Sequence, residues 1–588
     1  LSGPHLHFEV RNPKNQPINP YLVGIHADDS IPPKPIDIVI KPANSNTLIN
    51  GYNEKSRLPI EKIDDQYLVR DTISVIGDFS ISINTNDRIN GSPFKFGIYR
   101  ISLIIDSEII YDISYDKLDY NEQKYIYFER DFELNREYSG NYYKLNPINY
   151  NSNFIKLRNN NTIKFNDQKY HNATISITDH GGNTADVDIV IYNKNTGSKE
   201  PQIIKDNGNF YVRFFNDKII PEFYSSSPYI NDKHIKLDAI RVDRNTYQID
   251  SYFREPYTVL SINSKTISGS RLQNYHLNLS DISIYPDGDF TIQQNEHGLI
   301  IKFIEQSFTG LDAYLSIKNN GRYSKHQLFR KDRNILQTGL LDPYKFDHIK
   351  EIQIHYDHSP EIVFRKKINS VMVLPNEPFS LPYNLGSIII KGDRNTFNEK
   401  TMVWTDNSKK IKDTSKREIK YGPISLMPNK KSYNNEISID FKTNGDKGLG
   451  IFYLNTKKNT WEYVETLSNS RRNVLTCDIK SGGTYAVLTD NSKPIIKNMI
   501  PGNGGMYQSE DLTEISFNII DDFPGIDGEE SISISLNDRP IIFEYNSYQK
   551  KVRYLLENKL DNGLHLIRID AKDYLGNHTN KTIRFSVQ

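Results

Sequence analysis

The sequence has little cysteine and no excess of charge of either sign. Its 588 residues contain one cysteine, Cys477, which excludes an intrachain disulfide framework and a Cys-x-x-Cys metal site. Cys477 lies in an alternating run typical of a strand, so we expect an inert, buried thiol. Basic and acidic residues both total 73, and this balance favours neither a nucleic-acid partner nor an anionic membrane surface.

Long apolar runs and helical periodicity are also missing. No run approaches the roughly 18 apolar residues of a membrane-spanning helix, so we expect no transmembrane segment. No signal peptide is visible, and because the chain starts with Leu1 inside a motif, we expect any export signal upstream of it. Neither a Gly-x-Ser-x-Gly elbow nor a Walker-type phosphate loop occurs.

What the sequence does contain is alternation of apolar and polar residues. Runs such as 36–40, 79–83 and 532–536 alternate with period 2, which predicts strands with one buried face. Clusters of Asn, Asp, Gly and Pro separate these runs at short intervals. Many short strands with frequent turns indicate an all-β fold of tandem antiparallel β-sandwich domains.

Four connectors divide the chain. They are the Pro-rich run 28–35, the polar run 193–201, and the runs 373–378 and 490–494. We therefore expect sandwiches at 34–195, 376–490 and 492–588. The stretch 201–375 has room for one large sandwich or two small ones, and the pattern leaves both open.

A repeated hairpin motif ends two of these regions. Residues 175–183 resemble residues 569–577: in both, an alternating strand runs into Asp-x-x-Gly-Asn and a second alternating run follows. The Asp carboxylate can cap such a turn, and Gly followed by Asn tolerates the positive φ that it requires. The regions 34–195 and 492–588 resemble bacterial immunoglobulin-like domains on this basis.

The first residues carry the pattern with the most specific chemistry. The run Gly-Pro-His-Leu-His-Phe-Glu-Val-Arg occupies residues 3–11, and Ile-Asn-Pro-Tyr-Leu follows at 18–22. Alternation places His5, His7 and Glu9 on one face of a strand. Two histidines two residues apart then project the same way, about 6–7 Å apart, so that one can bind a metal and the other can address a metal-bound water.

This segment resembles the end of the M23 (lysostaphin/LytM-like) zinc metallopeptidase core, with 1–27 as its C-terminal remnant. The resemblance implies that His7 is a Zn²⁺ ligand and that His5 is the catalytic histidine that polarises the attacking water. The family cleaves peptide cross-links of bacterial peptidoglycan. Its remaining zinc ligands, a His and an Asp in His-x-x-x-Asp, and a further catalytic His are expected upstream of Leu1, so we expect the present chain to be inactive alone.

Three other segments contain residue types that occur in metal-binding or sugar-binding sites. The acidic run 521–530 is interpreted as a solvated loop between strands, with a Ca²⁺ site as the alternative. The Tyr-rich run 120–128 is expected to form cross-strand aromatic pairs, with stacking on sugar rings as the alternative. In 355–358 the strand pattern puts His355 and Asp357 on one face and His358 on the other, which argues against a metal site.

The sequence supports three interpretations of function. The first is the C-terminal part of a secreted or periplasmic bacterial M23-type endopeptidase, whose sandwiches act as spacers or bind peptidoglycan or another envelope component. The second is an envelope scaffold or regulator with a degenerate peptidase core. The third is an adhesin-like binding protein. The oligomeric state is left open by the sequence.

Overall fold

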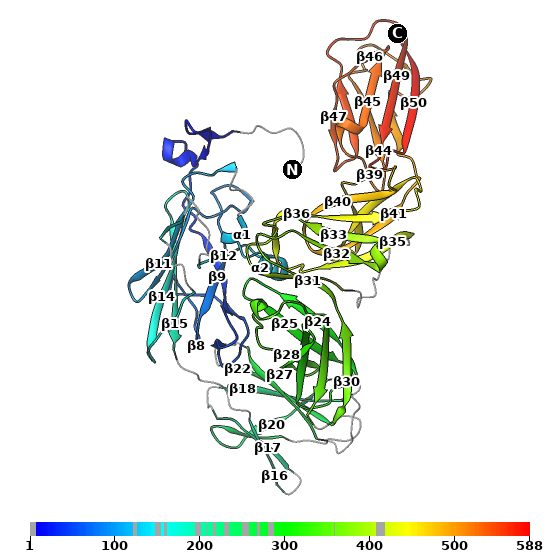
Figure 1. Cartoon of the computed structure of the whole chain (residues 1–588). Helices are drawn as coiled ribbons and strands as arrows, with labels where there is room; N and C mark the ends of the chain where they lie inside the picture. Colours follow the sequence, from blue (N-terminus) through cyan, green and yellow to red (C-terminus); the bar gives the residue numbers. More distant parts are fainter. Residues whose placement is uncertain are drawn as a thin grey trace.

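Antiparallel β-sheets make up nearly all of the regular structure (Figure 1). The computed structural model describes residues 8–120, 126–146, 155–157, 162–193, 201–206, 209–215, 219–228, 234–249, 258–266, 271–279, 287–357, 359–406 and 418–588. Within this part of the chain, the predicted all-β fold of tandem immunoglobulin-like sandwiches is confirmed. None of its helices is long and apolar enough to cross a lipid bilayer.

The first described residues form a two-stranded ladder and one 3-10 turn. The elements are β1 (Val10–Arg11), β2 (Pro17–Ile18) and η1 (Pro20–Val23). Asn19 caps η1, since its Oδ1 accepts a hydrogen bond from Tyr21 N at 3.1 Å. Gly24 ends the turn with a φ of 82°, which a glycine adopts without strain.

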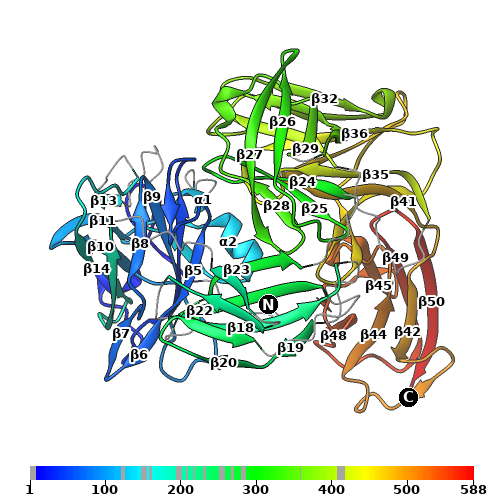
Figure 2. The same ribbon diagram turned by 90° about the horizontal axis from the view of Figure 1, so that it is seen from below.

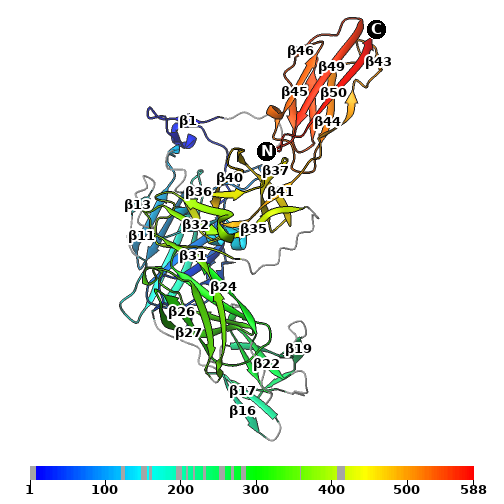
Figure 3. The ribbon, with the colours of Figure 1, turned by 45° about the vertical axis from the view of Figure 1, so that its right-hand side comes forward.

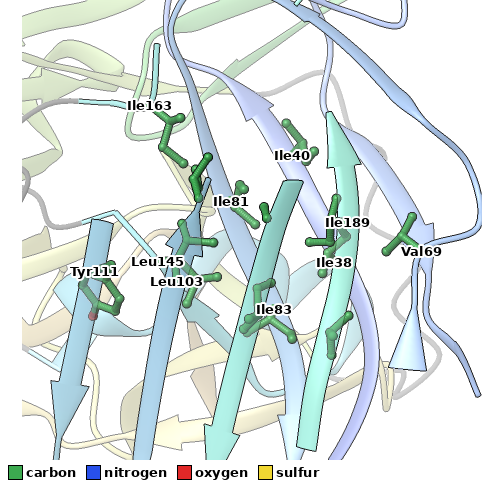
Figure 4. Close-up of a cluster of buried hydrophobic side chains, with 14 of the residues drawn as sticks. Ile38, Ile40, Val69, Ile81, Ile83, Leu103, Tyr111, Leu145, Ile163 and Ile189 are labelled. Atoms are coloured by element: carbon green, nitrogen blue, oxygen red, sulfur yellow. The ribbon is translucent and has the colours of Figure 1, made fainter. Parts of the chain in front are cut away.

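Residues 34–193 form a sandwich of two sheets. Alternation turns Ile38, Ile81 and Ile83 of the smaller sheet towards Leu103 and Ile189 of the larger one (Figure 4). The smaller sheet, in the order β12-β9-β3-β5, consists of β3 (Lys34–Pro42), β5 (Ser56–Pro59), β9 (Phe79–Asn86) and β12 (Tyr142–Lys144). The larger sheet consists of β4 (Leu48–Ile49), β6 (Glu61–Ile63), β7 (Gln66–Leu68), β8 (Ile73–Ile76), β10 (Arg100–Ile105), β11 (Glu108–Ser114), β13 (Ile155–Leu157), β14 (Tyr170–Thr178) and β15 (Thr184–Tyr192).

Two short helices in this sandwich were not expected from the sequence. They are α1 (Ile126–Glu129) and α2 (Phe132–Tyr138), and Asp131 caps α2 by accepting a hydrogen bond from Leu134 N at 3.1 Å. The expected cross-strand pairing of the run 120–128 is therefore wrong for residues 126–128. Helices of four and seven residues are too short to show a 3.6-residue pattern of apolar residues. The sequence therefore predicts strands here, as in the neighbouring segments.

Two four-stranded sheets follow, and the buried residues described between them include Val212, Phe223 and Ile262. One sheet consists of β16 (Gln202–Asp206), β17 (Asn209–Arg213), β20 (Ala239–Arg241) and β21 (Thr246–Ile249). The other consists of β18 (Ile219–Ser226), β19 (His234–Leu237), β22 (Val259–Thr266) and β23 (Arg271–Asn278).

A seven-stranded sheet comes next and has a core of its own, so two hydrophobic clusters lie between residues 201 and 375. The sheet, with η3 (Pro343–Lys345) beside it, consists of β24 (Gly288–Gln294), β25 (Leu299–Glu305), β26 (Ala313–Asn319), β27 (Arg322–Asp332), β28 (Ile335–Thr338), β29 (Glu351–Tyr356) and β30 (Ser359–Lys367).

The following sandwich shares one of its sheets with the unit before it. The shared six-stranded sheet consists of β31 (Asn369–Val373), β34 (Thr401–Thr405), β35 (Ile419–Met427), β37 (Leu449–Asn455), β38 (Thr460–Val464) and β41 (Gly483–Thr489). Its partner, with η4 (Asn384–Gly386), consists of β32 (Phe379–Tyr383), β33 (Ile388–Gly392), β36 (Ser432–Lys442), β39 (Leu467–Asn469) and β40 (Val474–Ser481).

Strand β34 is buried on both faces. Met402 and Trp404 belong to the core of the seven-stranded unit, whereas Val403 belongs to the core of the following sandwich. The connector expected at 373–378 joins β31 to β32, and β31 pairs directly with β34. The two units therefore share one continuous three-layered packing.

The C-terminal sandwich resembles the first one in its layout. Its four-stranded sheet consists of β42 (Ile495–Ile500), β44 (Glu514–Ile520), β47 (Glu544–Asn546) and β48 (Lys551–Leu555). Its five-stranded sheet, with η5 (Glu529–Ser531), consists of β43 (Met506–Tyr507), β45 (Ile532–Leu536), β46 (Arg539–Pro540), β49 (Gly563–Lys572) and β50 (His578–Val587).

Both predicted hairpins are confirmed. Strands β14 and β15 pair up to the last residues before the Asp179–Asn183 turn, and β49 and β50 pair in the same way around Asp573–Asn577. Asp179 Oδ1 accepts from Asn183 N at 2.9 Å, and Gly182 takes the positive φ of 89°. Asn183 has another role than the expected one: its Nδ2 donates to Asp179 Oδ2 at 2.8 Å.

The units do not form a straight row, because the first sandwich lies beside the middle units (Figures 1 and 2). The C-terminal sandwich stands at one end and the β16–β17 sheet at the other (Figures 1 and 3). The first sandwich, in blue and cyan, lies beside the green strands of the two middle units when the molecule is seen from below (Figure 2).

Candidate functional site

The segment that follows the His-x-His motif is fixed to the first sandwich. His5 and His7 themselves lie outside the described residues. Glu9, on the face expected for both histidines, accepts a hydrogen bond from Tyr120 Oη at 2.8 Å and one from Arg11 Nε at 2.7 Å. The Glu9 carboxylate is therefore hydrogen-bonded to Tyr120, which follows the β10–β11 hairpin of the first sandwich, and to Arg11.

Backbone contacts continue this attachment. Asn19 N donates to Asp116 O at 2.9 Å, and Leu118 N donates to Pro17 O at 2.8 Å. These bonds, with a bridge between Ile18 and Lys117, add β2 to the edge of the loop after β11. Residues 17–19, near the expected end of the N-terminal segment, therefore attach that segment to the first sandwich.

Aromatic rings complete the junction. The Tyr21 ring lies 5.3 Å from His26 and 5.8 Å from His180, which belongs to the Asp179–Asn183 turn; Tyr99 packs on the same imidazole at 5.3 Å. Burial lowers the pKa of His180, so it remains neutral here at neutral pH. The junction is held by packing rather than by charge pairs of this histidine.

The described residues contain one group of three potential metal ligands close enough to share an ion: Asp29, Asp87 and Asp179. This group contains no histidine or cysteine, whereas catalytic zinc sites commonly include imidazole ligands. Zinc binding by His7 and catalysis by His5 stay predictions, because both residues lie outside the described part of the chain.

A buried ion cluster joins the first sandwich to the seven-stranded unit. Lys41 Nζ lies 2.6 Å from Asp131 Oδ2, and the two side chains are 2% and 1% exposed. Lys41 also pairs with Glu296, from the turn between β24 and β25, and Glu296 pairs with Lys144. Ser82 Oγ donates to Asp131 Oδ2 at 2.8 Å.

The cluster compensates its own burial. Burial by itself would lower the pKa of Lys41, but the charges of Asp131 and Glu296 outweigh it and raise that pKa. Burial would raise the pKa of Glu296, and the charges of Lys144 and Lys41 hold it well below its ordinary value. Lys41 and Glu296 therefore stay charged within a network of ion pairs that spans two units.

The other candidates from the sequence have structural roles. The expected burial of Cys477 is confirmed: it is 1% exposed in the core of the fourth unit, the sandwich that contains β36 and β40, and burial raises the pKa of its thiol to about 12. His355 stacks on Tyr314 across β26 and β29, with ring centroids 4.8 Å apart. His358 lies outside the described residues. The run 521–530 does connect β44 to β45, as expected for a loop between strands.

A shallow pocket of about 280 Å³ lies at the tip of the seven-stranded sheet, lined by Lys318, Asn320, Gly321, His348, Lys350, Glu351 and Lys367. Three of these seven residues are lysines, and Glu351 beside them accepts a hydrogen bond from Tyr323 Oη at 2.9 Å. Because lysines and a glutamate line the same pocket, its charges do not indicate whether it would bind an anion or a cation.

Comparisons with known proteins add little on function. No family model and no curated protein matches the chain. The N-terminal eight Ig domains of Down Syndrome Cell Adhesion Molecule match at 9% identity over 96% of this chain and 71% of that one, with a TM-score of 0.17. The extracellular domain of the hybrid two component system BT3049 from B. thetaiotaomicron matches at 10% identity, 93% and 77% coverage and a TM-score of 0.16.

A tetra-tandem repeat from the extending region of a large adhesion protein matches at 8% identity, over 87% of this chain and 95% of that one, with a TM-score of 0.13. Such TM-scores carry no argument about activity or partners. The functional inference therefore rests on the chain's own residues.

Proposed function

We propose that this chain is a fixed multi-domain β-sandwich arm of an exported bacterial protein, serving as a scaffold or binding module of the cell envelope. The observation that carries the proposal is the buried cluster of Lys41, Asp131, Lys144 and Glu296 between two units. Buried charges are tolerated where geometry holds them in pairs, whereas freely moving domains expose polar, wet surfaces to each other. The cluster thus supports an arm with fixed joints.

Further contacts between units support the same proposal. Arg136 of α2 donates to Asn429 O at 2.6 Å, and Glu137 pairs with Lys430 at 2.6 Å, which connects the first sandwich to the fourth unit. At the other end, the Phe452 and Phe523 rings stack with centroids 4.6 Å apart. Apolar and aromatic contacts of this kind hold a domain in one orientation.

Binding to peptidoglycan or another envelope component is tested by co-sedimentation. The full chain is mixed with purified bacterial sacculi and centrifuged, and we expect it in the pellet. A matched incubation without sacculi gives the background. A chain that stays in the supernatant in both tubes contradicts binding to the cell wall. The arm would then act only as a spacer or scaffold.

A second candidate is favoured by the motif at residues 3–11 and by the anchoring of β2: the arm positions an M23-type zinc endopeptidase core. In this proposal His7 binds Zn²⁺ and His5 polarises the attacking water, while ligands outside the described residues complete the site. Zinc supplies Lewis acidity and a water of lowered pKa when bound.

The complete gene product decides between the two candidates. If the enzyme proposal holds, we expect stoichiometric zinc and the appearance of new free amino groups on sacculi, and loss of both in a His7→Ala variant. Zinc-free protein that still binds sacculi would contradict the enzyme and support the scaffold.

A further inference from the structure

Three carboxylates meet where the N-terminal segment enters the first sandwich. Asp29 lies in the connector before β3, Asp87 directly follows β9, and Asp179 directly follows β14 and opens its hairpin turn. One carboxylate oxygen of each lies within 4.8 Å of the others. The fold therefore brings three like charges from distant parts of the chain to one point.

Asp87 provides the evidence that this group binds a ligand. Its side chain is 2% exposed, and its Oδ1 is buried without a hydrogen-bond partner. Leaving a buried carboxylate oxygen unpaired is costly, so native structures pair such atoms or bind an ion to them. Burial first, and then the charges of Asp179 and Asp29, raise the pKa of Asp87 to about 6.

The other two carboxylates are held in place by hydrogen bonds from backbone N–H groups and from the Asn183 side chain. Asp179 is fully buried and accepts from Asn183 N and Nδ2, while Asp29 Oδ1 accepts from Ile31 N at 3.0 Å. Asn183 Nδ2 also donates to Asp29 O at 3.3 Å. Gly181 permits this approach, because a Cβ there would lie 3.2 Å from Asp29 Cβ. The geometry is thus preorganised rather than incidental.

The C-terminal sandwich repeats this arrangement at its own junction. Asp490 lies in the connector, Asp521 directly follows β44, and Asp573 opens the β49–β50 turn. Asn577 Nδ2 donates to Asp490 O at 3.2 Å, as Asn183 does to Asp29. Asp521 Oδ2 is buried without a hydrogen-bond partner. The same three positions thus gather acidic groups in two separate domains.

We propose that Asp29, Asp87 and Asp179 bind one calcium ion, which clamps the connector to the first sandwich. Calcium takes 6–8 oxygen ligands at about 2.3–2.6 Å, so its ligand shell is about 4.6–5.2 Å across and accommodates oxygens within 4.8 Å of each other. Zinc prefers nitrogen and sulfur ligands, which this group lacks. The site stands independently of the proposed arm and of the peptidase.

The ion offsets the repulsion of the three charges and satisfies Asp87 Oδ1. Since Asp29 belongs to the connector, binding also fixes the segment that carries β1, β2 and η1. The set around Asp521 is a candidate for the same chemistry, but its carboxylates do not reach the spacing of the first set among the described residues.

The test is calcium titration of the EDTA-treated full chain, by calorimetry and by thermal unfolding. We expect binding in the range of extracellular modules, Kd of about 10⁻⁴–10⁻³ M, with a rise of the unfolding midpoint. Asp87→Asn should weaken this binding at least about tenfold. Asp28→Asn, on the exposed neighbour of Asp29, is the matched control and should leave binding unchanged.

A stability measurement separates a metal ligand from a merely structural residue. In EDTA, Asp87→Asn should unfold at the same temperature as the wild type or higher, because it removes a buried charge; in calcium it should unfold lower than the wild type. An Asp521→Asn variant assigns any second calcium. Absence of calcium binding, an unchanged titration of Asp87→Asn, or a response to magnesium alone overturns the proposal.

Discussion

Lys41 shows how a single residue decides the relation between two domains. It ends an apolar run of β3 and is 2% exposed, although lysine is almost never buried without partners. Asp131 comes from the cap of α2 in the same sandwich, and Glu296 comes from another unit. The ammonium group can therefore be buried only when both parts of the chain are in place.

Replacing Lys41 tests this dependence. Lys41→Met keeps the stem but leaves Asp131 and Glu296 without their shared cation, so we expect a loss of about 3–5 kcal/mol in the free energy of unfolding. Urea denaturation of the full chain measures it. Lys62→Met, at the exposed pair with Asp65, is the control and should have no measurable effect. Equal behaviour of the two variants would contradict a role for the cluster.

His297 makes the same interface sensitive to acid. Its Nε2 lies 3.1 Å from Ser80 Oγ, and burial lowers its pKa below the ordinary 6.5, although the charge of Glu296 opposes this. Below pH 6.5 the unfolded chain takes up a proton that the folded chain refuses, so stability falls as the pH drops. His297→Gln should show a flatter loss of stability between pH 6.5 and 5 than the wild type. Parallel curves would rule out this contribution.

Cys477 gives a probe of the fourth core. Because its thiol is 1% exposed and its pKa is raised to about 12, we expect no reaction with a thiol reagent such as Ellman's reagent in native protein. One equivalent should react after denaturation. Rapid labelling of the native chain would show that this core opens easily.

At the scale of elements, β34 joins two units by facing both ways. Trp404 belongs to the core of the seven-stranded unit, while Val403 belongs to the core that also contains residues of β33 and β36. A strand with both faces buried couples the stability of the layers on either side, since loosening one removes support from the other.

Trp404→Ala tests this coupling. We expect a loss of about 3–5 kcal/mol from the cavity and faster hydrogen exchange in both β26 and β36, although Trp404 contacts only one core. Leu467→Ala, at a side chain 61% exposed, is the control. Faster exchange confined to the seven-stranded unit would show that the two layers unfold separately.

The sequence predicts the elements better than their assembly. Period-2 alternation identifies strands such as β3, β9 and β45, and the Asp-x-x-Gly-Asn turns locate two hairpins, because both signals are local. The pattern misses α2, which has seven residues, and the role of Asp87, which follows a strand with no turn motif of its own. It cannot reveal which distant carboxylates meet.

The partners of a charged residue are non-local as well. Lys41 at the end of an apolar run looks like the exposed end of a strand, because nothing near it in the sequence indicates Glu296, 255 residues away. The sequence likewise names His5 and His7 through a local motif, but their ligand partners are a prediction that the described residues do not test.

At the scale of the molecule, neighbouring units are connected by joints that fix their orientation. The joints are of three physical kinds: a buried ion cluster at Lys41, a doubly buried strand at β34 and stacked aromatics at Phe523. Each removes freedom that a polar linker would leave between neighbouring domains. The arm can then hold its N-terminal segment at a set position relative to the C-terminal sandwich.

Small-angle X-ray scattering of the full chain tests this claim most directly. We expect one rigid structure, with the units placed as in Figure 1, to reproduce the whole curve. We also expect Phe523→Ala to expand the particle by freeing the C-terminal sandwich. A wild-type curve that fits only an ensemble of independently moving sandwiches, with no change in the variant, would contradict this claim.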